Sequence, residues 1–232
     1  GFYDVSELVT PSQKKLMLFS GRSHPELAEH IARELGCDVS PTKLYDFANG
    51  EIFVRFEESV RGSDAFVLQA HAEPLNKSIM EQLIMVDALK RASAKRLTVI
   101  TPFYGYARQD KKHNGREPIT ARLMANLFAT AGADRLMAVD LHTSQIQGFF
   151  DGPVDHLFAL PILAEYVGKN VDRERLTIVS PDAGRVRVAE RWTDVLGSPL
   201  AIIHKRRDPN VPNQVSVLEV VGDVKDRVCV IV

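Results

Sequence analysis

The sequence predicts an α/β protein in which mainly parallel sheets are flanked by helices. Short runs rich in apolar residues, such as Leu97–Thr101, Leu136–Val139 and Leu176–Val179, have the length and composition of strands buried on both faces of a sheet. Turns and helical patterns alternate with these runs, which is typical of parallel strands joined by helical crossovers. Polar residues cluster directly after several runs. Because ligands of open α/β sheets bind beyond the carboxyl ends of the strands, these clusters are candidate functional sites.

The first part of the chain begins with a strand, a turn and a helix. Pro25 is a favourable first helical residue and Gly36 a favourable stop, and Asn49-Gly50 between two strand patterns indicates a hairpin. In order, the predicted elements are strand Lys15–Phe19, helix Pro25–Leu35, strands Leu44–Phe47, Ile52–Phe56 and Ala65–Ala70, helix Ser78–Arg91, strand Leu97–Thr101, a helix that begins at Pro118 and contains Ile119, Leu123 and Leu127 at every fourth position, and strand Leu136–Val139.

A second domain is predicted after the strand patterns of the first. Ser20-Gly21-Arg22 and Ser180-Pro181-Asp182 each follow a strand and precede a helix, which indicates two related domains, residues 1–157 and 158–232. The second domain is predicted to hold helix Pro161–Val167, strand Leu176–Val179, helix Arg185–Leu196 and strands Leu200–Ile203, Val215–Val221 and Val228–Val232. The last of these has a buried-strand pattern and no turn after it, so we expect this domain to be incomplete at its C-terminus.

Composition excludes several classes of function. The 232 residues are 45% hydrophobic and 25% charged, and the formal net charge is -1, so no global basic field draws the protein to nucleic acid or to an anionic membrane. Any phosphate site must therefore be local. Cys37 and Cys229 form no metal or redox pair, and we expect both to be buried thiols in a reducing, cytoplasmic compartment. No apolar run approaches the ~18 residues of a membrane span.

The loop after Leu97–Thr101 concentrates positive charge. Arg108, Lys111, Lys112 and, when protonated, His113 lie within six residues of one another. At the carboxyl end of a parallel strand, such cations favour a polyphosphate ligand. A solvated charge run explains the same residues without a ligand, so both interpretations remain open at this point.

Three other polar residues stand out at strand ends. Asp140 and His142 follow Leu136–Val139, and Asp182 lies in a Pro-Asp turn at the start of a helix. The simpler explanations are that Asp140 and His142 order their loop and that Asp182 caps its helix. A basic segment begins at Lys205 and continues into a polar stretch that is loop-like enough to form a mobile lid.

A basic lid and acidic turns together suit phosphoryl transfer. Cations neutralise the charge that develops, and His142 and Asp182 can hold a divalent metal that bridges phosphate oxygens. The sequence contains no G-x-x-x-x-G-K-[ST] motif, no kinase glycine loop, no Ser-His-Asp elbow and no zinc spacing. A nucleotide would therefore be held by neither of the familiar glycine-rich loops.

From about Lys15 to Val232 the sequence resembles the ribose-phosphate diphosphokinase family, also called the phosphoribosyl pyrophosphate synthetases. The resemblance rests on DLHTSQIQGFFDGPVD from Asp140 to Asp155, on YARQDKK, on SPDAG and on VGDVKDR. It implies two phosphoribosyltransferase-like domains and transfer of the β,γ-diphosphoryl group of ATP to the 1-hydroxyl of ribose 5-phosphate, which leaves AMP. It also implies Mg²⁺ as cofactor and a homo-oligomer, commonly a hexamer, with phosphate and ADP as effectors.

The resemblance also implies roles for individual residues. In the family, the segment matching Phe47–Glu51 reaches the adenine from a neighbouring subunit. The implied site residues are Phe47, Asn49, Gly50, Glu51, Arg108, Gln109 and Asp110 for ATP, His142 and Asp182 for the metal, Lys205 and Arg207 for catalysis, and Arg207 and Asp182 for ribose 5-phosphate. Arg185 stands where many members have Gly, and no role is implied for it. An acidic loop that grips ribose 5-phosphate is expected directly after Val232.

Two other classes compete with the enzyme. A non-catalytic subunit that assembles with active subunits and regulates them, or an inactive fragment without the acidic loop, would carry the same fold. A regulatory chain has no chemical need for Lys205 and Arg207 opposite His142 and Asp182. A phosphoribosyltransferase shares the domain type, but it does not account for a separate ATP-like loop at Arg108–Lys112.

Overall fold

The computed structural model describes residues 15–205 and 218–232, with the side chain of Lys205 left out. The chain divides into two compact units, Gly1–Leu157 (unit 1) and Phe158–Val232 (unit 2), and each is described by itself. Among the described residues, no helix has both the length and the apolar character needed to cross a membrane. Of the basic segment predicted as a lid, Arg207 lies outside the described residues.

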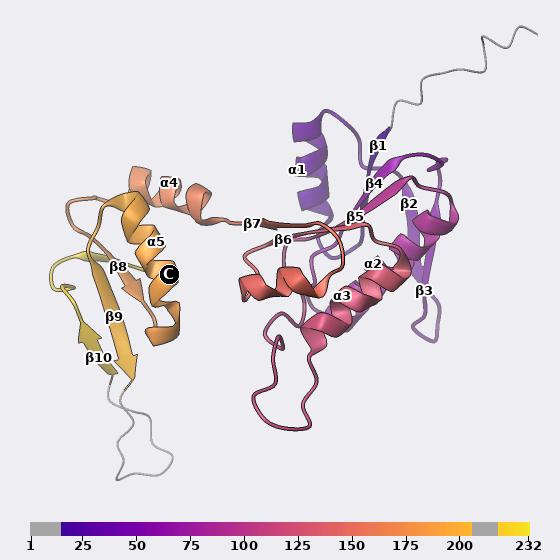
Figure 1. The fold of residues 1–232 in the computed structure, drawn as a ribbon. Coiled ribbons are helices and arrows are strands. Elements are labelled where there is room, and N and C mark those ends of the chain that lie inside the picture. Colours follow the sequence, from indigo (N-terminus) through magenta and orange to yellow (C-terminus); the bar gives the residue numbers. More distant parts are fainter. Residues whose placement is uncertain (1–14, 206–217) are drawn as a thin grey trace, which may run out of the picture. The chain divides into compact units, whose positions relative to one another are not determined.

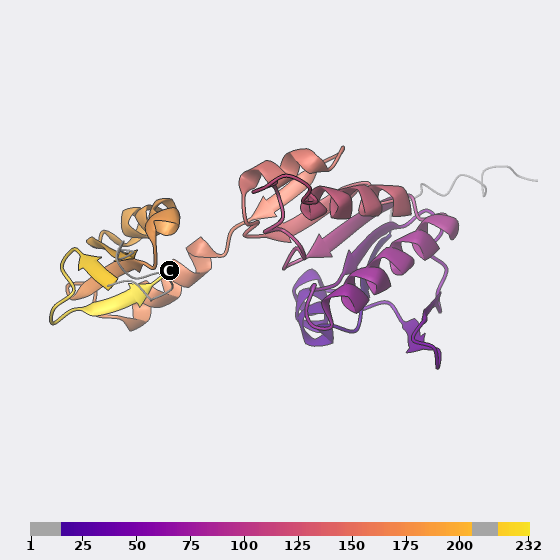
Figure 2. The ribbon, with the colours of Figure 1, turned by 90° about the horizontal axis from the view of Figure 1, so that it is seen from below.

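Unit 1 is built on a five-stranded, fully parallel sheet with the order β1-β4-β5-β6-β7 (Figure 1). Its elements are β1 (Leu16–Ser20), α1 (Pro25–Leu35), β2 (Thr42–Asp46), β3 (Ile52–Phe56), β4 (Asp64–Leu68), α2 (Leu75–Arg91), β5 (Arg96–Thr101), α3 (Thr120–Ala131), β6 (Arg135–Val139), the 3-10 helix η2 (Ser144–Phe149) and β7 (Val154–Leu157). Strands β2 and β3 pair with each other in a separate antiparallel hairpin, which projects from the edge of unit 1 in Figure 2.

The parallel sheet of unit 1 is covered on both faces. Leu18 and Leu68 point to one face and pack with Ala28 and Ala32 of α1. Alternate residues of the same strands, such as Phe19, point to the other face, where α2 and α3 pack. This two-sided burial is the reason that the strands are apolar at nearly every position, as the sequence indicated.

The helix ends follow the signals in the sequence. Helix α1 begins at Pro25 and ends before Gly36, whose φ of 67° is left-handed, so the predicted helix is confirmed. Helix α3 ends before Gly132, which is also left-handed. The buried face of α3 consists of Ala121, Met124, Ala125 and Phe128, whereas Leu123 and Leu127 of the four-residue recurrence are exposed.

Unit 2 is a smaller α/β unit with a four-stranded sheet in the order β10-β9-β8-β11. Its elements are α4 (Leu160–Asn170), β8 (Leu176–Ser180), the 3-10 turn η3 (Ala183–Arg185), α5 (Val186–Leu196), β9 (Leu200–Lys205), β10 (Leu218–Val221) and β11 (Val228–Ile231). Only β10 is antiparallel to its neighbour among the described strands of this sheet. Trp192, Leu196 and Ala164 pack on Leu176 and Ile178, so α4 and α5 share one core with β8.

Some expectations from the sequence are wrong. Strand β7 and helix η2 were not predicted, because β7 has only four residues and includes Asp155 and His156. Cys37 is only half-buried and Cys229 is exposed, so the prediction of two buried thiols fails. Cys229 lies on β11, where Val228 and Val230 are half-buried but Cys229 and Ile231 are exposed, so one face of this strand is uncovered in the described structure.

Candidate active site

Three loops of unit 1 lie along one edge of its parallel sheet. Strands β4, β5 and β6 are neighbours and run in the same direction. The segments that follow them, 69–74, 102–119 and 140–153, therefore leave the sheet at the same edge. This is the edge at which α/β sheets bind ligands.

The loop after β5 carries the predicted ATP residues Arg108 and Gln109. Both are exposed, as are Lys111 and Lys112. Gln109 is tied to the start of α3, because its Oε1 accepts a hydrogen bond from Thr120 Oγ1 at 2.5 Å and its carbonyl accepts one from Ala121 N at 3.1 Å. Arg108 thus extends from a stretch of backbone that is held on its C-terminal side.

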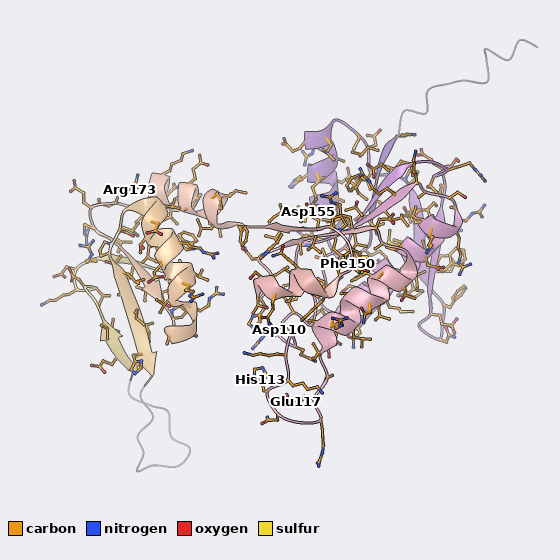
Figure 3. The ribbon with its side chains drawn as sticks, in the orientation of Figure 1. Asp110, His113, Glu117, Phe150, Asp155 and Arg173 are labelled. Atoms are coloured by element: carbon orange, nitrogen blue, oxygen red, sulfur yellow. The ribbon has the colours of Figure 1, made fainter. Side chains whose placement is uncertain are left out.

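The outer part of the same loop is closed by a carboxylate. Figure 3 shows Asp110 near the base of the loop and His113 and Glu117 farther along it. Glu117 Oε2 accepts hydrogen bonds from the backbone N–H groups of His113 and Asn114 at 2.8 and 3.0 Å. These backbone hydrogen bonds, from Asn114 and then His113, lower the pKa of Glu117. The carboxylate therefore stays charged and keeps the turn closed near neutral pH.

Asp110 joins the loop after β5 to the loop after β6. Its side chain is only 4% exposed and its Oδ2 accepts hydrogen bonds from Thr143 Oγ1 at 2.5 Å and Gln145 Nε2 at 3.0 Å. Burial alone raises the pKa of Asp110, but the hydrogen bonds from Thr143, from its own backbone and from Gln145, together with the positive charge of His142, bring the pKa below its usual value. Asp110 positions the two loops in this structure, and its contact with ATP stays a prediction.

The loop after β6 presents His142 to solvent. His142 and the preceding Asp140 are both exposed, and Asp140 has a left-handed φ of 46°. Asp tolerates left-handed backbone better than most residues other than Gly and Asn, so this conformation turns the chain sharply at the end of β6 without marking a function by itself. On the neighbouring strand, His156 Nε2 accepts a hydrogen bond from Leu141 N at 2.9 Å, which fixes the loop directly beside His142.

The hairpin β2–β3 carries the other predicted ATP residues on its turn. Gly50 has a φ of 89° and donates its N–H to the carbonyl of Phe47, and Asn49 exchanges hydrogen bonds with Glu51. Phe47 is 46% exposed and lies in a ring cluster with Tyr45 and Phe53, of which Tyr45 stacks on Phe53 at 4.7 Å. Exposed ring faces of this kind can stack on a nucleobase.

The hairpin is held next to its turn by an ionic cluster that sequence reasoning missed. Arg22 lies in the turn after β1, where its Nε donates to Glu81 Oε2 at 2.8 Å and its Nη2 donates to Asp46 Oδ1 at 2.7 Å. Lys77 of α2 donates to the other oxygen of Asp46. The hydrogen bond from Lys77 and then that from Arg22 lower the pKa of Asp46. Asp46 directly precedes Phe47, so the cluster fixes the hairpin next to its turn.

In unit 2, Asp182 and Lys205 lie at the same edge of a sheet. Strands β8 and β9 are parallel neighbours, with Ser180 paired to Ile202, so the turn after β8 and the end of β9 at Lys205 share the carboxyl edge. Asp182 Oδ1 accepts a hydrogen bond from Arg185 N at 3.0 Å, so the simpler explanation of a capping carboxylate is realised. The exposed Arg185 has no role that the structure explains beyond this backbone contact.

The two predicted metal ligands belong to different units, His142 to unit 1 and Asp182 to unit 2. Within the described ranges no group of three or more His, Cys, Asp or Glu side chains is arranged to hold a metal ion. A Mg²⁺ ion bound with a nucleotide needs only one or two carboxylates from the protein, because phosphate oxygens and waters complete its shell. The exposed carboxylate of Asp182 fits that role, whereas His142 offers an imidazole nitrogen, a ligand type that suits other metals better than Mg²⁺.

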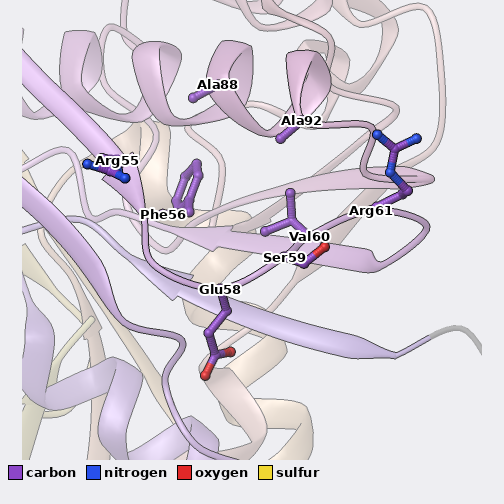
Figure 4. Close-up of a pocket in the computed structure, with 8 residues that line it drawn as sticks. All are labelled: Arg55, Phe56, Glu58, Ser59, Val60, Arg61, Ala88 and Ala92. Atoms are coloured by element: carbon purple, nitrogen blue, oxygen red, sulfur yellow. The ribbon is translucent and has the colours of Figure 1, made fainter.

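One pocket of unit 1 lies away from these loops. It has a volume of about 330 Å³ and is lined by Arg55, Phe56, Glu58, Ser59, Val60, Arg61, Ala88 and Ala92 (Figure 4). Val60 and Arg61 precede β4, and Ala88 and Ala92 precede β5, so the pocket lies toward the amino ends of these strands. It is therefore separate from the edge that carries Arg108 and His142.

Comparisons with known proteins identify the family of the chain. A family model described as the N-terminal domain of ribose phosphate pyrophosphokinase matches residues 16–132. A ribose-phosphate pyrophosphokinase from Streptomyces coelicolor is 72% identical over 223 residues, which are 96% of this chain and 69% of the relative. One from Corynebacterium glutamicum is 64% identical over 95% of this chain and 68% of the relative, and one from Mycobacterium tuberculosis is 62% identical over 96% and 69%.

A solved structure matches as well. The crystal structure of phosphoribosylpyrophosphate synthetase from Mycobacterium smegmatis superposes with a TM-score of 0.87 at 62% sequence identity, over 94% of this chain and 70% of that chain. The fold is thus of the two-domain, phosphoribosyltransferase-like α/β class, as the sequence predicted. The chain belongs to the ribose-phosphate pyrophosphokinase family, and the resemblance seen in its motifs is confirmed.

Proposed function

We propose that this protein transfers the β,γ-diphosphoryl group of ATP to the 1-hydroxyl of ribose 5-phosphate, giving 5-phosphoribosyl 1-diphosphate and AMP for nucleotide biosynthesis. The observation that carries the proposal is the pair of loops after β5 and β6. Asp110 ties these loops together, and they present Arg108 and His142 at one sheet edge. Relatives that are 62–72% identical over nearly the whole chain bear the name of this enzyme.

The ATP site is proposed on unit 1. Arg108 supplies a guanidinium, which pairs with phosphate oxygens through two parallel hydrogen bonds, and Gln109 supplies an amide beside it. Asp110 holds their loop against the loop that carries His142. The hairpin turn, with Phe47, Asn49, Gly50 and Glu51, is proposed to contact the adenine of a neighbouring subunit, which requires a homo-oligomer such as the hexamer that the resemblance implies.

Mg²⁺ is proposed as the cofactor, with His142 and Asp182 as its protein ligands. When bound, the ion withdraws charge from the phosphate oxygens that it contacts. His142 is already exposed beside the negatively charged Asp110, which favours a cation at this position. Asp182 presents its carboxylate at the edge of unit 2 where β9 ends in Lys205.

Lys205 and Arg207 are proposed to act on the reacting phosphate. The 1-hydroxyl must attack the middle phosphorus of ATP in line with the leaving AMP oxygen, and negative charge spreads over the oxygens between them. Lys205 is proposed to neutralise this charge in the transition state, and Arg207 to hold a phosphate, with Asp182 beside the ribose 5-phosphate. A lid that closes over the site also excludes the water that would hydrolyse ATP.

The proposal also covers the effectors of the enzyme and its cellular compartment. Phosphate and ADP are proposed as effectors, and the cytoplasm as the compartment, from the resemblance and the composition. Cys37 and Cys229 are both free thiols, which agrees with a reducing compartment.

A non-catalytic subunit of the same family is the second candidate. It would keep the fold and the hairpin but would have no need for a basic residue at the end of β9 next to the turn of Asp182. The two candidates differ in one measurement. The enzyme releases AMP from ATP only when ribose 5-phosphate is present, whereas the non-catalytic subunit alone releases none under either condition.

Substitution of Lys205 tests the catalytic part of the proposal. Because its contact is proposed to be made mainly in the transition state, Lys205→Ala should lower the rate of AMP release by at least about a hundredfold while the affinity for ATP changes by less than about threefold. ATP affinity measured by calorimetry beside the rate of AMP release separates these effects. An equal loss in both would assign Lys205 a binding or structural role instead.

A further inference from the structure

A chain of hydrogen bonds crosses the interior of unit 1 from the sheet to the loop after β5. Gln82 of α2 donates from Nε2 to the carbonyls of Val67 and Ile100, each at 3.0 Å. Its Oε1 lies 2.8 Å from Nε2 of His71, in the segment after β4. On the far side of the ring, His71 Nδ1 accepts the backbone N–H of Gly105 at 2.8 Å. The chain therefore runs from two strands through two side chains to the loop.

The directions of these hydrogen bonds allow only one assignment of protons. The carbonyls of Val67 and Ile100 can only accept, so the amide nitrogen of Gln82 faces them and its oxygen faces His71. Gly105 N–H can only donate, so Nδ1 of His71 carries no proton and Nε2 donates to Gln82. His71 is therefore a neutral ring in a single tautomer, and every polar atom along the chain has a partner.

Burial makes this chain rigid. His71 is 1% exposed and Gln82 is 0% exposed. The His71 ring lies parallel to Phe128 of α3 with centroids 5.8 Å apart, and Tyr104 stands at 6.3 Å on another side. A ring that is packed between aromatic side chains and bonded at both nitrogens has one orientation. The position of Gly105 N is set by that orientation.

Gly105 is the point where the loop approaches the ring. A Cβ atom at this position would lie 2.9 Å from Ile79 Cδ1 and 3.2 Å from His71 Nδ1, so only glycine allows the contact without a shift of its neighbours. Tyr106, the next residue, has a left-handed φ of 66°. Arg108 and Gln109 follow shortly after it in the same loop. Any movement of Gly105 is thus carried directly to the side chains that are proposed to bind ATP.

We propose that His71 and Gln82 are positioning residues for ATP binding, because through Gly105 they hold the backbone from which Arg108 and Gln109 extend. This inference rests on the proposed function, in which that loop contacts ATP. Burial, only partly opposed by the hydrogen bond to Gln82, lowers the pKa of His71 to about 4. The ring therefore stays neutral near pH 7 and can accept the hydrogen bond from the N–H of Gly105. Neither side chain touches the nucleotide in this account.

The test compares His71→Leu with His71→Asn. Leucine fills much of the space but offers no hydrogen-bond acceptor, so the N–H of Gly105 loses its partner and the loop relaxes. The KM for ATP should therefore rise about tenfold, while kcat falls less than about threefold. Asparagine places an amide oxygen near the position of Nδ1 and should keep KM for ATP within about threefold of the unchanged protein. Gln82→Leu removes the acceptor of Nε2 and should raise KM by an intermediate factor.

Hydrogen exchange gives a readout that does not depend on ATP. In His71→Leu the amides of the loop around Gly105 should exchange faster, whereas those of β5 should not. Thr98→Val is the matched control, because Thr98 is buried in β5 with a hydroxyl that has no hydrogen-bond partner in the described structure. It should leave both KM for ATP and loop exchange unchanged.

Several outcomes would overturn the inference. An unchanged KM for ATP in His71→Leu, or an asparagine variant as impaired as the leucine variant, would show that the ring serves only the fold. Arg108→Ala distinguishes this failure from failure of the proposed function. If Arg108→Ala raises KM for ATP and His71→Leu does not, only the positioning role fails. If Arg108→Ala leaves KM unchanged, the ATP site itself is misplaced and the inference falls with it.

Discussion

His71 makes the stability of unit 1 sensitive to acid. Burial lowers the pKa of its ring to about 4 in the folded protein, against 6.5 for an unperturbed ring. The unfolded chain therefore binds a proton at a higher pH than the folded chain does, so this stability is present above about pH 6.5 and is lost as the pH falls toward about 4. The groups packed around the ring are Gln82, Gly105, Tyr104 and Phe128, none of which is charged near neutral pH.

We expect unfolding in urea to detect this titration. The free energy of unfolding should fall by about 2 kcal/mol between about pH 7.5 and about pH 5 through this residue alone. Asparagine does not titrate, so His71→Asn should show a shallower dependence on pH over the same range, whatever its stability at neutral pH. Equal slopes for the two proteins would mean that the ring is already accessible to protons in the folded state.

Residues on the surface of the site were easier to predict than those beneath it. Arg108 and His142 follow buried strands in the sequence, and a rule about strand ends is enough to select them. Glu81 and Gln82 lie inside helix α2, and their burial depends on partners from the ends of β1 and β4 that no local spacing reveals. A polar residue next to a core-facing helical stripe is the only signal that the sequence offered, and it is a weak one.

At the scale of elements, the position of the hairpin β2–β3 depends on Glu81, a buried carboxylate of helix α2. Glu81 is 2% exposed and accepts hydrogen bonds from the backbone N–H and Nε of Arg22 and from Gln69 Nε2. Arg22 in turn reaches Asp46 at the end of β2, next to the turn of the hairpin. The hydrogen bond from Arg22 to Glu81 is the main reason that the pKa of Arg22 is raised, although burial opposes it.

Removal of Glu81 should therefore have a larger effect than removal of a surface charge. Glu81→Ala leaves Arg22 and Gln69 without their shared acceptor, and we expect a loss of about 3 kcal/mol in the free energy of unfolding. Asp87→Ala is the control, because Asp87 pairs with Arg91 on the exposed side of the same helix and should cost much less. Urea midpoints at neutral pH give the comparison, and similar midpoints for the two variants would contradict the buried role of Glu81.

The elements themselves were predictable to different degrees. Helix α1 and the hairpin have explicit start and stop residues, Pro25, Gly36 and Asn49-Gly50, and both were predicted. The core-facing side of α3 was not evident, because two of its four buried residues are the small Ala121 and Ala125, while the larger Leu123 and Leu127 face outward. Size alone misleads where a helix packs closely, since small residues are what permit the close approach.

At the scale of the whole molecule, the two units divide the proposed chemistry between them. Each unit has its own hydrophobic core, with Phe19 and Phe128 in unit 1 and Trp192 and Ile178 in unit 2. The residues proposed to bind ATP before the reaction lie in unit 1, whereas Lys205, proposed to act in the transition state, and the proposed metal ligand Asp182 lie in unit 2. A ligand stabilises the structure that binds it, so the units should respond differently to ATP alone.

Hydrogen exchange with ATP, without ribose 5-phosphate or Mg²⁺, tests this division. At ATP concentrations about a hundredfold above Kd, binding stabilises the unit that binds ATP by about 2.7 kcal/mol. Amides of β5 and β6 that exchange only when unit 1 unfolds should therefore exchange about a hundredfold more slowly. Amides of β8 and β9 should change little, because their core in unit 2 unfolds without releasing ATP. Arg108→Ala should abolish the protection of unit 1, and equal protection of both units in the unchanged protein would place part of the nucleotide site in unit 2.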